Sequence, residues 1–176
     1  MCKFKIIACL NNKNALGKDG GLLYHISNDL MNFKSQTIGN VVIMGRKTFE
    51  GLPNGAPLKD RINIIITSNE DFCVDEMYED VYIVKSIEDA VELCDALFSD
   101  KELFVIGGAS IYSQFLERGL VDEMRLTIVK DESDGDVYFP SYNENMWRCY
   151  YRSLAQNASS NGQNISFNFV VLKKNF

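Results

Sequence analysis

One stretch decides the fold class of this sequence: Leu103-Phe104-Val105-Ile106-Gly107-Gly108-Ala109-Ser110-Ile111-Tyr112. Its first four residues are apolar, with β-branched and aromatic types among them, which favours a short buried strand over residues 103–106. A glycine pair follows, and residues 109–118 then place apolar side chains on one face of a helix that stops at Gly119. A strand, a tight glycine turn and a helix in this order are typical of α/β proteins.

The same alternation of strands and helices extends in both directions from this stretch. Ser86 is expected to cap one helix, with Asp89 at the third helical position, and Ser27 is expected to cap another. Parallel strands need a connection of about a dozen residues between them, which these helices supply. The sequence therefore predicts an α/β fold with a mostly parallel central sheet and helices on both faces. Strands are expected at residues 4–10, 41–44, 62–66, 81–84, 103–106 and 124–129.

The end of the chain has a different pattern. Residues 147–156 and 165–172 flank the polar stretch 157–164, which predicts a long C-terminal hairpin that adds antiparallel strands to one edge of the sheet. Residues 11–23, rich in Asn and Gly, form the most loop-like stretch near a strand end. No repeat, low-complexity linker or break in composition divides the chain, so residues 1–176 are expected to form a single domain.

Composition and charge exclude several classes of protein. The chain has 176 residues, a net charge of −6 and no run of five or more Lys and Arg residues, so it lacks an electrostatic footprint for nucleic acid. Its five cysteines are odd in number and show no CxxC spacing, which suits reduced thiols better than disulfides or a zinc site. No segment approaches the roughly 18 apolar residues of a membrane span, and the first ten residues do not resemble a signal peptide. We therefore expect no metal, no nucleic-acid or membrane partner and a cytoplasmic location.

Ligands of such sheets collect at the carboxyl ends of the strands, so the residues that follow each strand are candidates for a site. Gly107-Gly108 opens a helix, where bare backbone can approach a phosphate, although the pair taken alone also suits a plain tight turn. Arg46-Lys47 stands at a second helix start, after Gly45. This basic pair suits either a phosphate clamp or a solvated surface.

Asp29 is the candidate acid. It lies in the first turn after Ser27, beside Leu30 and one turn before Phe33, directly behind the loop-like residues 11–23. An acid at this position also complements the helix dipole, so the position alone does not prove a function. The sole histidine, His25, is interpreted as structural because no Ser, Cys or acid stands at a triad-like spacing from it.

Taken together and in this order, the motifs of the sequence resemble the dihydrofolate reductase family over essentially the whole chain. Each motif is weak by itself, but their joint order and spacing are specific. The matching segments are Ile7-Ala8-Cys9-Leu10, Leu16-Gly17, Asp29-Leu30-Met31-Asn32-Phe33-Lys34, Val42-Ile43-Met44-Gly45-Arg46-Lys47-Thr48-Phe49-Glu50, Arg61-Ile62-Asn63-Ile64-Ile65, Val105-Ile106-Gly107-Gly108-Ala109-Ser110-Ile111-Tyr112, Leu126-Thr127, Gly135-Asp136 and Tyr138-Phe139-Pro140.

The resemblance implies an enzyme that reduces 7,8-dihydrofolate to 5,6,7,8-tetrahydrofolate with NADPH, in support of one-carbon metabolism, and that binds antifolate inhibitors. It implies catalytic roles for Asp29, Leu22, Tyr24 and Thr127. A single carboxylate suits the two parallel N–H donors of a pterin ring, and the planar guanidinium of Arg61 suits the glutamate tail of folate. The substrate-binding residues that the resemblance implies are Ile7, Cys9, Asp29, Leu30, Phe33, Leu52, Leu58, Arg61, Ile106, Tyr112 and Thr127.

For the cofactor, the resemblance implies phosphate contacts at Arg46, Lys47 and Thr48, a cis peptide between Gly107 and Gly108, and a mobile loop over the nicotinamide at residues 11–24. The full set of implied NADPH-binding residues is Ala8, Leu16, Gly17, Gly45, Arg46, Lys47, Thr48, Thr67, Ser68, Lys85, Ile106, Gly107, Gly108, Ala109, Ser110, Ile111 and Tyr112.

The sequence departs from the family pattern in three places. Leu23-Tyr24 replaces the usual Pro-Trp, Ser110 occupies a position that is often basic, and residues 53–57 form a longer segment than in many relatives. Two other interpretations stay open: a pyrimidine reductase of riboflavin synthesis, which shares this fold, and a non-catalytic nucleotide-binding domain. Asp29 together with Arg61 favours folate. The resemblance also suggests a monomer.

Overall fold

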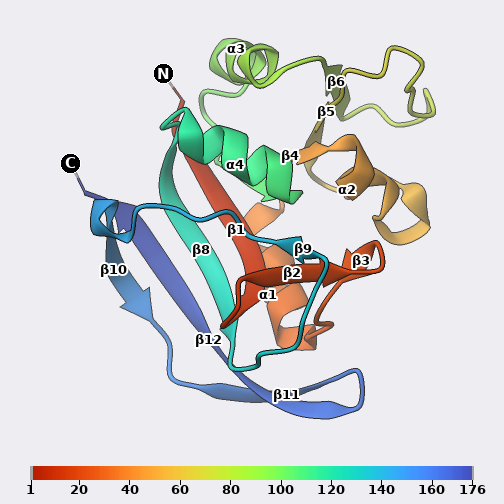
Figure 1. Ribbon diagram of the computed structural model, residues 1–176. Coiled ribbons are helices and arrows are strands. Elements are labelled where there is room, and N and C mark those ends of the chain that lie inside the picture. Colours follow the sequence, from red (N-terminus) through yellow and green to blue (C-terminus); the bar gives the residue numbers. More distant parts are fainter. Residues whose placement is uncertain (1, 176) are drawn as a thin grey trace.

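A computed structural model of the protein describes residues 2–175. Within these residues, nine strands form one central sheet in the order β10-β12-β8-β1-β7-β4-β5-β6, with β11 paired to β12 (Figure 1). The pairs among β8, β1, β7, β4, β5 and β6 are parallel, and β12 pairs antiparallel with β8, β10 and β11. The strands are β1 (Phe4–Asn11), β4 (Val41–Gly45), β5 (Ile62–Ile66), β6 (Val81–Val84), β7 (Leu103–Gly107), β8 (Val121–Val129), β10 (Trp147–Arg152), β11 (Gln156–Ser160) and β12 (Gln163–Lys174).

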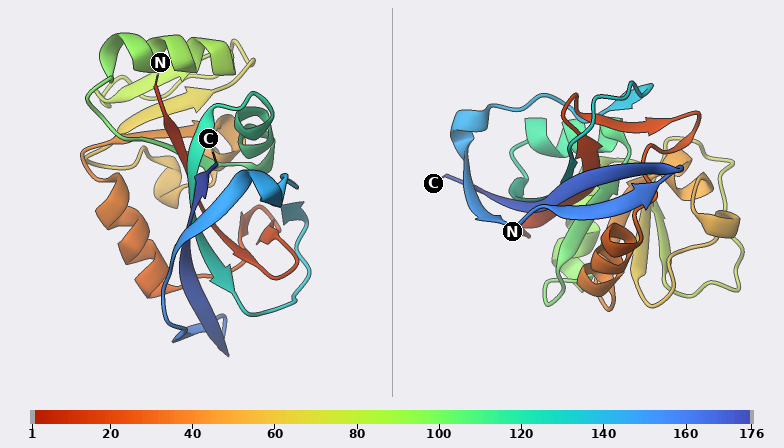
Figure 2. Two further views of the ribbon diagram at one scale, coloured as in Figure 1. Left: turned by 90° about the vertical axis from the view of Figure 1, so that its left-hand side faces the viewer. Right: turned by 90° about the horizontal axis from the view of Figure 1, so that it is seen from below.

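Helices cover both faces of the sheet, as the alternation of elements predicts. The longer helices are α1 (Ser27–Thr37), α3 (Ile87–Leu97) and α4 (Ala109–Glu117), and α2 (Arg46–Glu50) is short. Apolar side chains of α3 and α4 pack in one core cluster, whereas Phe33 of α1 and Phe49 of α2 pack in another. Figure 2 shows α1 and α4 on opposite sides of the strands. The expected α/β class, the mostly parallel sheet and the antiparallel C-terminal strands are confirmed.

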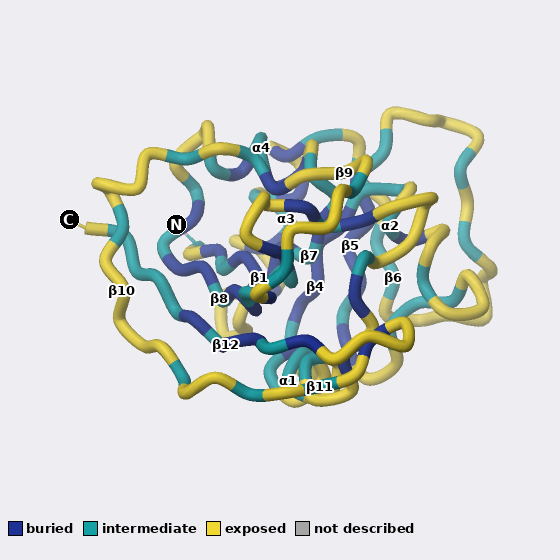
Figure 3. Tube along the Cα trace, turned by 60° about the horizontal axis from the view of Figure 1, so that its bottom comes forward, coloured by how far each residue is buried: buried dark blue, intermediate teal, exposed yellow. Residues whose placement is uncertain are grey.

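The continuous apolar runs of the central strands follow from this two-sided cover. In β4, Val41 and Ile43 face the α3 and α4 side, while Val42 and Met44 face the other cluster, and all four are buried. Successive side chains of a strand point to opposite faces, so a strand covered on both faces must be apolar throughout. Figure 3 shows buried residues along these central strands and exposed ones over much of β10 and β11.

Two of the helix ends predicted from the sequence, at Ser86 and at Gly119, are found in the structure, and the third, at Ser27, is not. The Ser86 hydroxyl accepts a hydrogen bond from the Asp89 N–H at 3.0 Å, and Gly119 follows α4 with a φ of 69°. The prediction that Ser27 caps α1 is wrong, because the N-cap residue is Ile26 and no side-chain cap bond forms. Ile26 is completely buried in a core cluster with Phe167. Burial of this apolar residue therefore fixes where the helix begins.

The C-terminal hairpin has its turn inside the stretch that was expected to be the connection. Residues 157–164 are mostly strand, and the turn is the pair Asn161-Gly162, with φ values of 52° and 78°. Two positive φ values are typical of a type I′ turn, which joins adjacent antiparallel strands. Composition alone misses these strands because their side chains are polar and face solvent on one side.

The loop-like residues 11–23 also form strands. β2 (Ala15–Lys18) pairs with β3 (Gly21–Leu22) and with β9 (Val137–Tyr138), which makes a small three-stranded sheet. The segment 53–57 contains a 3₁₀ turn, Pro53–Gly55, and a second such turn spans Glu144–Met146. None of the helices within residues 2–175 is long and apolar enough to cross a membrane.

Candidate active site

The site is built where two parallel strands separate. β1 pairs with β7 from Phe4 to Ile6, whereas its pairing with β8 continues to Asn11. Beyond Ile6 the strands β1 and β7 are therefore no longer hydrogen-bonded to each other. The buried Tyr112 hydroxyl of α4 donates to the carbonyl of Ile7 at 2.9 Å, just past this point. Divergence of neighbouring strands at their carboxyl ends is the usual origin of a ligand crevice in such sheets.

Asp29 approaches β1 and β8 from α1. The Thr127 hydroxyl of β8 donates to the Asp29 carboxylate at 2.5 Å. Cys9 of β1 lies opposite Thr127 in the strand register, and its thiol also donates to the Asp29 carboxylate. Residues far apart in the chain thus converge on one carboxylate.

The electrostatics of this cluster are set mainly by burial. Loss of solvation raises the pKa of Asp29, while the hydrogen bonds from Thr127 and Cys9 oppose that shift. Burial and the neighbouring carboxylate raise the pKa of the Cys9 thiol well above its usual value, so the thiol stays protonated and acts as a donor. The arrangement presents a half-buried carboxylate with two donors already in place.

The structure also gathers most of the apolar residues that were expected to contact substrate. Ile7 belongs to the core cluster on the α1 side of the sheet, and Phe33, Leu52, Leu58 and Ile106 pack against that cluster. Leu22 and Leu30 differ, because 53% and 45% of their surfaces are exposed. Both side chains therefore lie largely at the surface.

Arg61 lies beside the C-terminal end of α1. Its Nε donates to the Thr37 hydroxyl at 3.2 Å, and its Nη1 donates to the carbonyl of Lys59 at 2.6 Å. The residue is buried, so these two bonds hold the guanidinium in one orientation.

The residues expected to bind the cofactor come together at the starts of α2 and α4. A Cβ atom on Gly108 would lie 3.2 Å from the Thr48 hydroxyl, and one on Gly45 would lie 3.2 Å from a side-chain carbon of Ile111. Glycine at these positions lets the two helix starts approach each other closely. The Gly107–Gly108 peptide is cis, as the resemblance implies. Ala109 and Ser110 form the first turn of α4.

The basic pair and the next strand ends flank these helix starts. Arg46 bonds Glu50 one turn further along α2 at 2.7 Å, and Lys47 is exposed. Thr67 and Ser68 follow β5, and Lys85 follows β6, where it forms an ion pair with Glu70 at 2.8 Å. Ala8 and Leu16 are half-buried beside the larger core cluster, and Gly17 is buried in β2.

Tyr24 is placed in a hydrogen-bond network that the sequence did not reveal. Its hydroxyl donates to Asp131 at 2.5 Å and accepts from the Asn11 amide at 3.0 Å. Asn11 is buried and also bonds the carbonyl of Ser133 and the N–H groups of Lys13 and Ala15. The network ties residues 11–24 to the segment after β8. An Asn at a strand end is a common turn former, so nothing local marked it for this role.

No group of three or more His, Cys, Asp or Glu side chains suited to a metal ion occurs within residues 2–175.

Comparison with known proteins agrees with this geometry. A family model described as dihydrofolate reductase matches residues 3–174. Dihydrofolate reductase of Bacillus subtilis (strain 168) is 33% identical over 168 residues, which cover 96% of this chain and 92% of that protein. Dihydrofolate reductase of Neisseria gonorrhoeae is 35% identical over 170 residues, with 97% of both chains covered.

A solved structure is also similar to this fold. Dihydrofolate reductase from Enterococcus faecalis, complexed with NADP(H) and RAB-propyl, superposes with a TM-score of 0.81 and 26% identity over 99% of this chain and 97% of that one. The likeness thus extends over the whole chain in both sequence and fold, and the chain belongs to the dihydrofolate reductase family.

Proposed function

We propose that this protein reduces 7,8-dihydrofolate to 5,6,7,8-tetrahydrofolate with NADPH. The observation that carries the proposal is the half-buried Asp29 carboxylate, held by Thr127 and Cys9 beside the carboxyl ends of β8 and β1. A carboxylate in this setting can accept the two parallel N–H donors of a pterin ring. Membership of the family supports the same reaction.

Asp29 would orient the pterin and favour its protonation. The reduction adds a hydride to one carbon of the substrate's imine bond and a proton to the adjacent nitrogen. A negative charge close to the ring favours the protonated form of that nitrogen. Thr127 keeps the carboxylate in place, and the apolar residues Phe33, Leu52 and Leu58 would form walls for the remainder of the substrate.

The cofactor supplies the hydride when it is bound. Arg46, Lys47 and Thr48 would contact its phosphates, with Ser68 near the ribose 2′-phosphate and Lys85 elsewhere in the cofactor site. The helix starts at Gly45 and Gly108 fit this use, because they present bare backbone and N–H groups in a place where a Cβ would meet Thr48 or Ile111. Other residues of the expected cofactor set would border the same region. They are Ala8, Leu16, Gly17, Thr67, Ala109 and Ser110.

Arg61 would bind the glutamate tail of the substrate through its remaining donors. We further propose that the protein acts as a cytoplasmic monomer, that antifolates compete for the Asp29 site, and that nucleic acid and membranes are not partners.

The direct test mixes purified protein with NADPH and dihydrofolate and follows the near-ultraviolet absorbance of NADPH together with the formation of tetrahydrofolate. We expect oxidation that depends on both substrates and is largely lost in Asp29→Asn. A parallel reaction with a ribityl-phosphate pyrimidine tests the riboflavin alternative. Two outcomes with folded protein would overturn the proposal: oxidation of NADPH with the pyrimidine in place of dihydrofolate, or no oxidation of NADPH with either substrate.

A further inference from the structure

The helix that carries Asp29 has little apolar packing to hold it. Of the eleven residues of α1, all of which the structure describes, Thr37 alone is buried. Met31 is 67% exposed and Leu30 is 45% exposed, while Phe33 is half-buried. Because no side chain caps the start of the helix, this end also lacks the usual polar anchor.

Hydrogen bonds instead join α1 to the sheet at both of its ends. Asp29 bonds Thr127 near the start, and near the end the Gln36 side-chain carbonyl accepts from Arg125 Nη1 at 2.6 Å. Asp29 and Gln36 are seven residues apart and therefore share one face of the helix. Arg125 and Thr127 are two residues apart on β8 and therefore share one face of the strand. The two bonds fasten the same helix face to the same strand.

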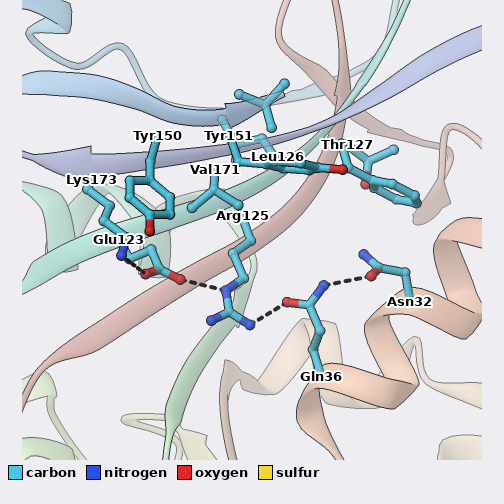
Figure 4. A pocket seen from close by; sticks show the side chains of 12 residues that line it. Asn32, Gln36, Glu123, Arg125, Leu126, Thr127, Tyr150, Tyr151, Val171 and Lys173 are labelled. Atoms are coloured by element: carbon cyan, nitrogen blue, oxygen red, sulfur yellow. Dashed lines mark hydrogen bonds and ion pairs between the residues drawn. The ribbon is translucent and has the colours of Figure 1, made fainter. Parts of the chain in front are cut away.

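Arg125 is itself held in a continuous chain of polar contacts (Figure 4). Its Nε donates to Glu123 at 2.6 Å, and the other oxygen of Glu123 lies 3.8 Å from Lys173 on β12. The guanidinium carbon lies 5.4 Å from the centre of the Phe104 ring. These contacts orient the guanidinium toward Gln36, whose amide in turn donates to Asn32 at 2.8 Å.

A cavity of about 450 Å³ opens between α1 and the sheet beside this chain of contacts. Asn32 and Gln36 line it from the helix, and Arg125, Thr127 and Phe169 line it from the strands. Side chains do not fill this space, so close packing cannot replace a lost polar contact here. Beside the packing of Phe33, the position of α1 over β8 therefore depends on these hydrogen bonds.

We propose that Arg125 is a positioning residue for Asp29. Through Gln36 it fixes α1 over β8, two helical turns from the carboxylate, and so sets the geometry in which Thr127 and the substrate meet Asp29. The inference rests on the proposed function, in which dihydrofolate binds at Asp29. It assigns Arg125 no contact with substrate or cofactor.

The main test is Arg125→Met, which keeps a long side chain over Phe104 and removes every donor. We expect KM for dihydrofolate to rise about tenfold, the size expected for loss of a charge-assisted hydrogen bond, while KM for NADPH changes less than about twofold. The matched control is Arg118→Met, which removes the Arg118–Glu88 ion pair at 2.9 Å between α4 and α3 and should leave both KM values unchanged. Equal losses for both substrates in Arg125→Met, or no loss for dihydrofolate, would overturn the inference.

Gln36→Met separates positioning from general destabilisation. If Arg125 acts through Gln36, this variant should show a similar rise in KM for dihydrofolate, and the double variant should be no worse than either single one. Additive losses would mean that Arg125 acts by another route. Because Arg125→Met and Gln36→Met each break the same hydrogen bond, either variant can test the inference if the other fails to fold.

A carboxyl-carbon NMR titration of Asp29 in ligand-free protein tests the link without catalysis. A displaced α1 changes both the burial of Asp29 and its bond from Thr127, so the pKa of Asp29 should shift in Arg125→Met relative to the parent and stay unchanged in Arg118→Met. An unchanged pKa in Arg125→Met would contradict the inference. The titration tests the positioning role of Arg125 even if the parent protein does not reduce dihydrofolate. Such a lack of activity would overturn the proposed function but not the positioning role.

Discussion

Asp29 is a carboxylate that the fold keeps partly away from water. Burial raises its pKa, and the bonds from Thr127 and Cys9 only oppose that shift. At pH values between the pKa that Asp29 has in the unfolded chain and its higher pKa in the folded protein, the folded state binds more protons than the unfolded state. The free energy of unfolding therefore falls as pH rises through this window, and the ionised Asp29 lowers stability at neutral pH.

Asp29→Asn should consequently have opposite effects on stability and on activity. The Asn carbonyl can still accept from Thr127, so the melting temperature at neutral pH should rise and the gain should vanish in acid. The catalytic efficiency should fall by roughly two to four orders of magnitude, as expected when a desolvated charged partner of the substrate is lost. Thermal unfolding across pH and single-turnover hydride transfer across pH measure the two effects.

Hydride transfer by Asp29→Asn should recover as pH falls, because acid supplies substrate that is already protonated. Binding of NADPH should hardly change and serves as the control. A variant with the parental rate at neutral pH, or one whose rate does not climb in acid while it remains folded, would remove Asp29 from the proposed role.

Arg61 links the end of α1 to the sheet and is also the proposed clamp for the glutamate tail. Arg61→Leu should weaken dihydrofolate binding roughly a hundredfold, about 3 kcal/mol for two charge-assisted bonds. A pterin that lacks the glutamate should lose much less, since it never contacts the guanidinium. Binding titrations with both ligands separate the roles: an equal loss would show that Arg61 acts by holding Thr37 and α1.

At the scale of elements, the start of α2 combines helix N–H groups with two cations, Arg46 and Lys47. Positive charge at a helix start opposes the helix dipole unless an anion lies nearby. Replacing both residues with glutamate should raise KM for NADPH by at least about tenfold and change KM for NADH much less, because NADPH alone carries a third phosphate for which this basic pair supplies charge. Steady-state kinetics with NADPH and with NADH measure both KM values. Equal increases in the two KM values would contradict a role of this basic pair in selecting NADPH.

The small sheet formed by β2, β3 and β9 is tethered to the end of β8 through Tyr24. Burial raises the pKa of Tyr24 to about 12, so its hydroxyl remains a donor at physiological pH. Hydrogen bonds from Ser133 and Tyr24 hold the pKa of Asp131 below its usual value. The stabilisation that these bonds give to the fold is therefore complete at pH values above the pKa that Asp131 has in the unfolded chain. It is lost as pH falls through the lower pKa that Asp131 has in the folded protein.

Tyr24→Phe should lower stability by about 1 kcal/mol at neutral pH, the typical net value of one hydrogen bond, and by less in acid. Backbone amides of residues 12–23 should exchange faster, because the loop loses its tether. Hydrogen exchange read by mass spectrometry, with α3 as an internal reference, checks this outcome. Unchanged exchange in residues 12–23 would show that the strand pairing alone holds the segment.

At the scale of the whole molecule, the two ends of the main sheet are poorly suited to pairing with another chain. β6 has four residues, and β10 carries Arg148 and Arg152 on an exposed edge. Short or charged edge strands disfavour edge-to-edge association, and the net charge of −6 adds repulsion between copies. Light scattering should therefore give the 20.0 kDa mass of one chain, and a concentration-independent dimer would contradict the proposed monomer.

Features governed by neighbours in the chain were predictable. The strand, glycine pair and helix around Gly107, the cap at Ser86 and the helix stop at Gly119 all follow from periodicity and local backbone preference. Ser27 was misassigned because the burial of Ile26, a contact with β12, outweighs a local capping preference. The polar strand pairs near Asn161 and in residues 11–23 have too little apolar alternation to be recognised from composition.

By itself the sequence determined the layered α/β fold and, through its motifs, the family and the candidate residues. Tertiary structure alone decided which of these residues meet. Asp29 and Thr127 are 98 residues apart, Gln36 and Arg125 are 89 apart, and Tyr24 and Asp131 are 107 apart. No local preference encodes such contacts, because they depend on the register and order of parallel strands, which only the packing of the complete sheet and its helices can set.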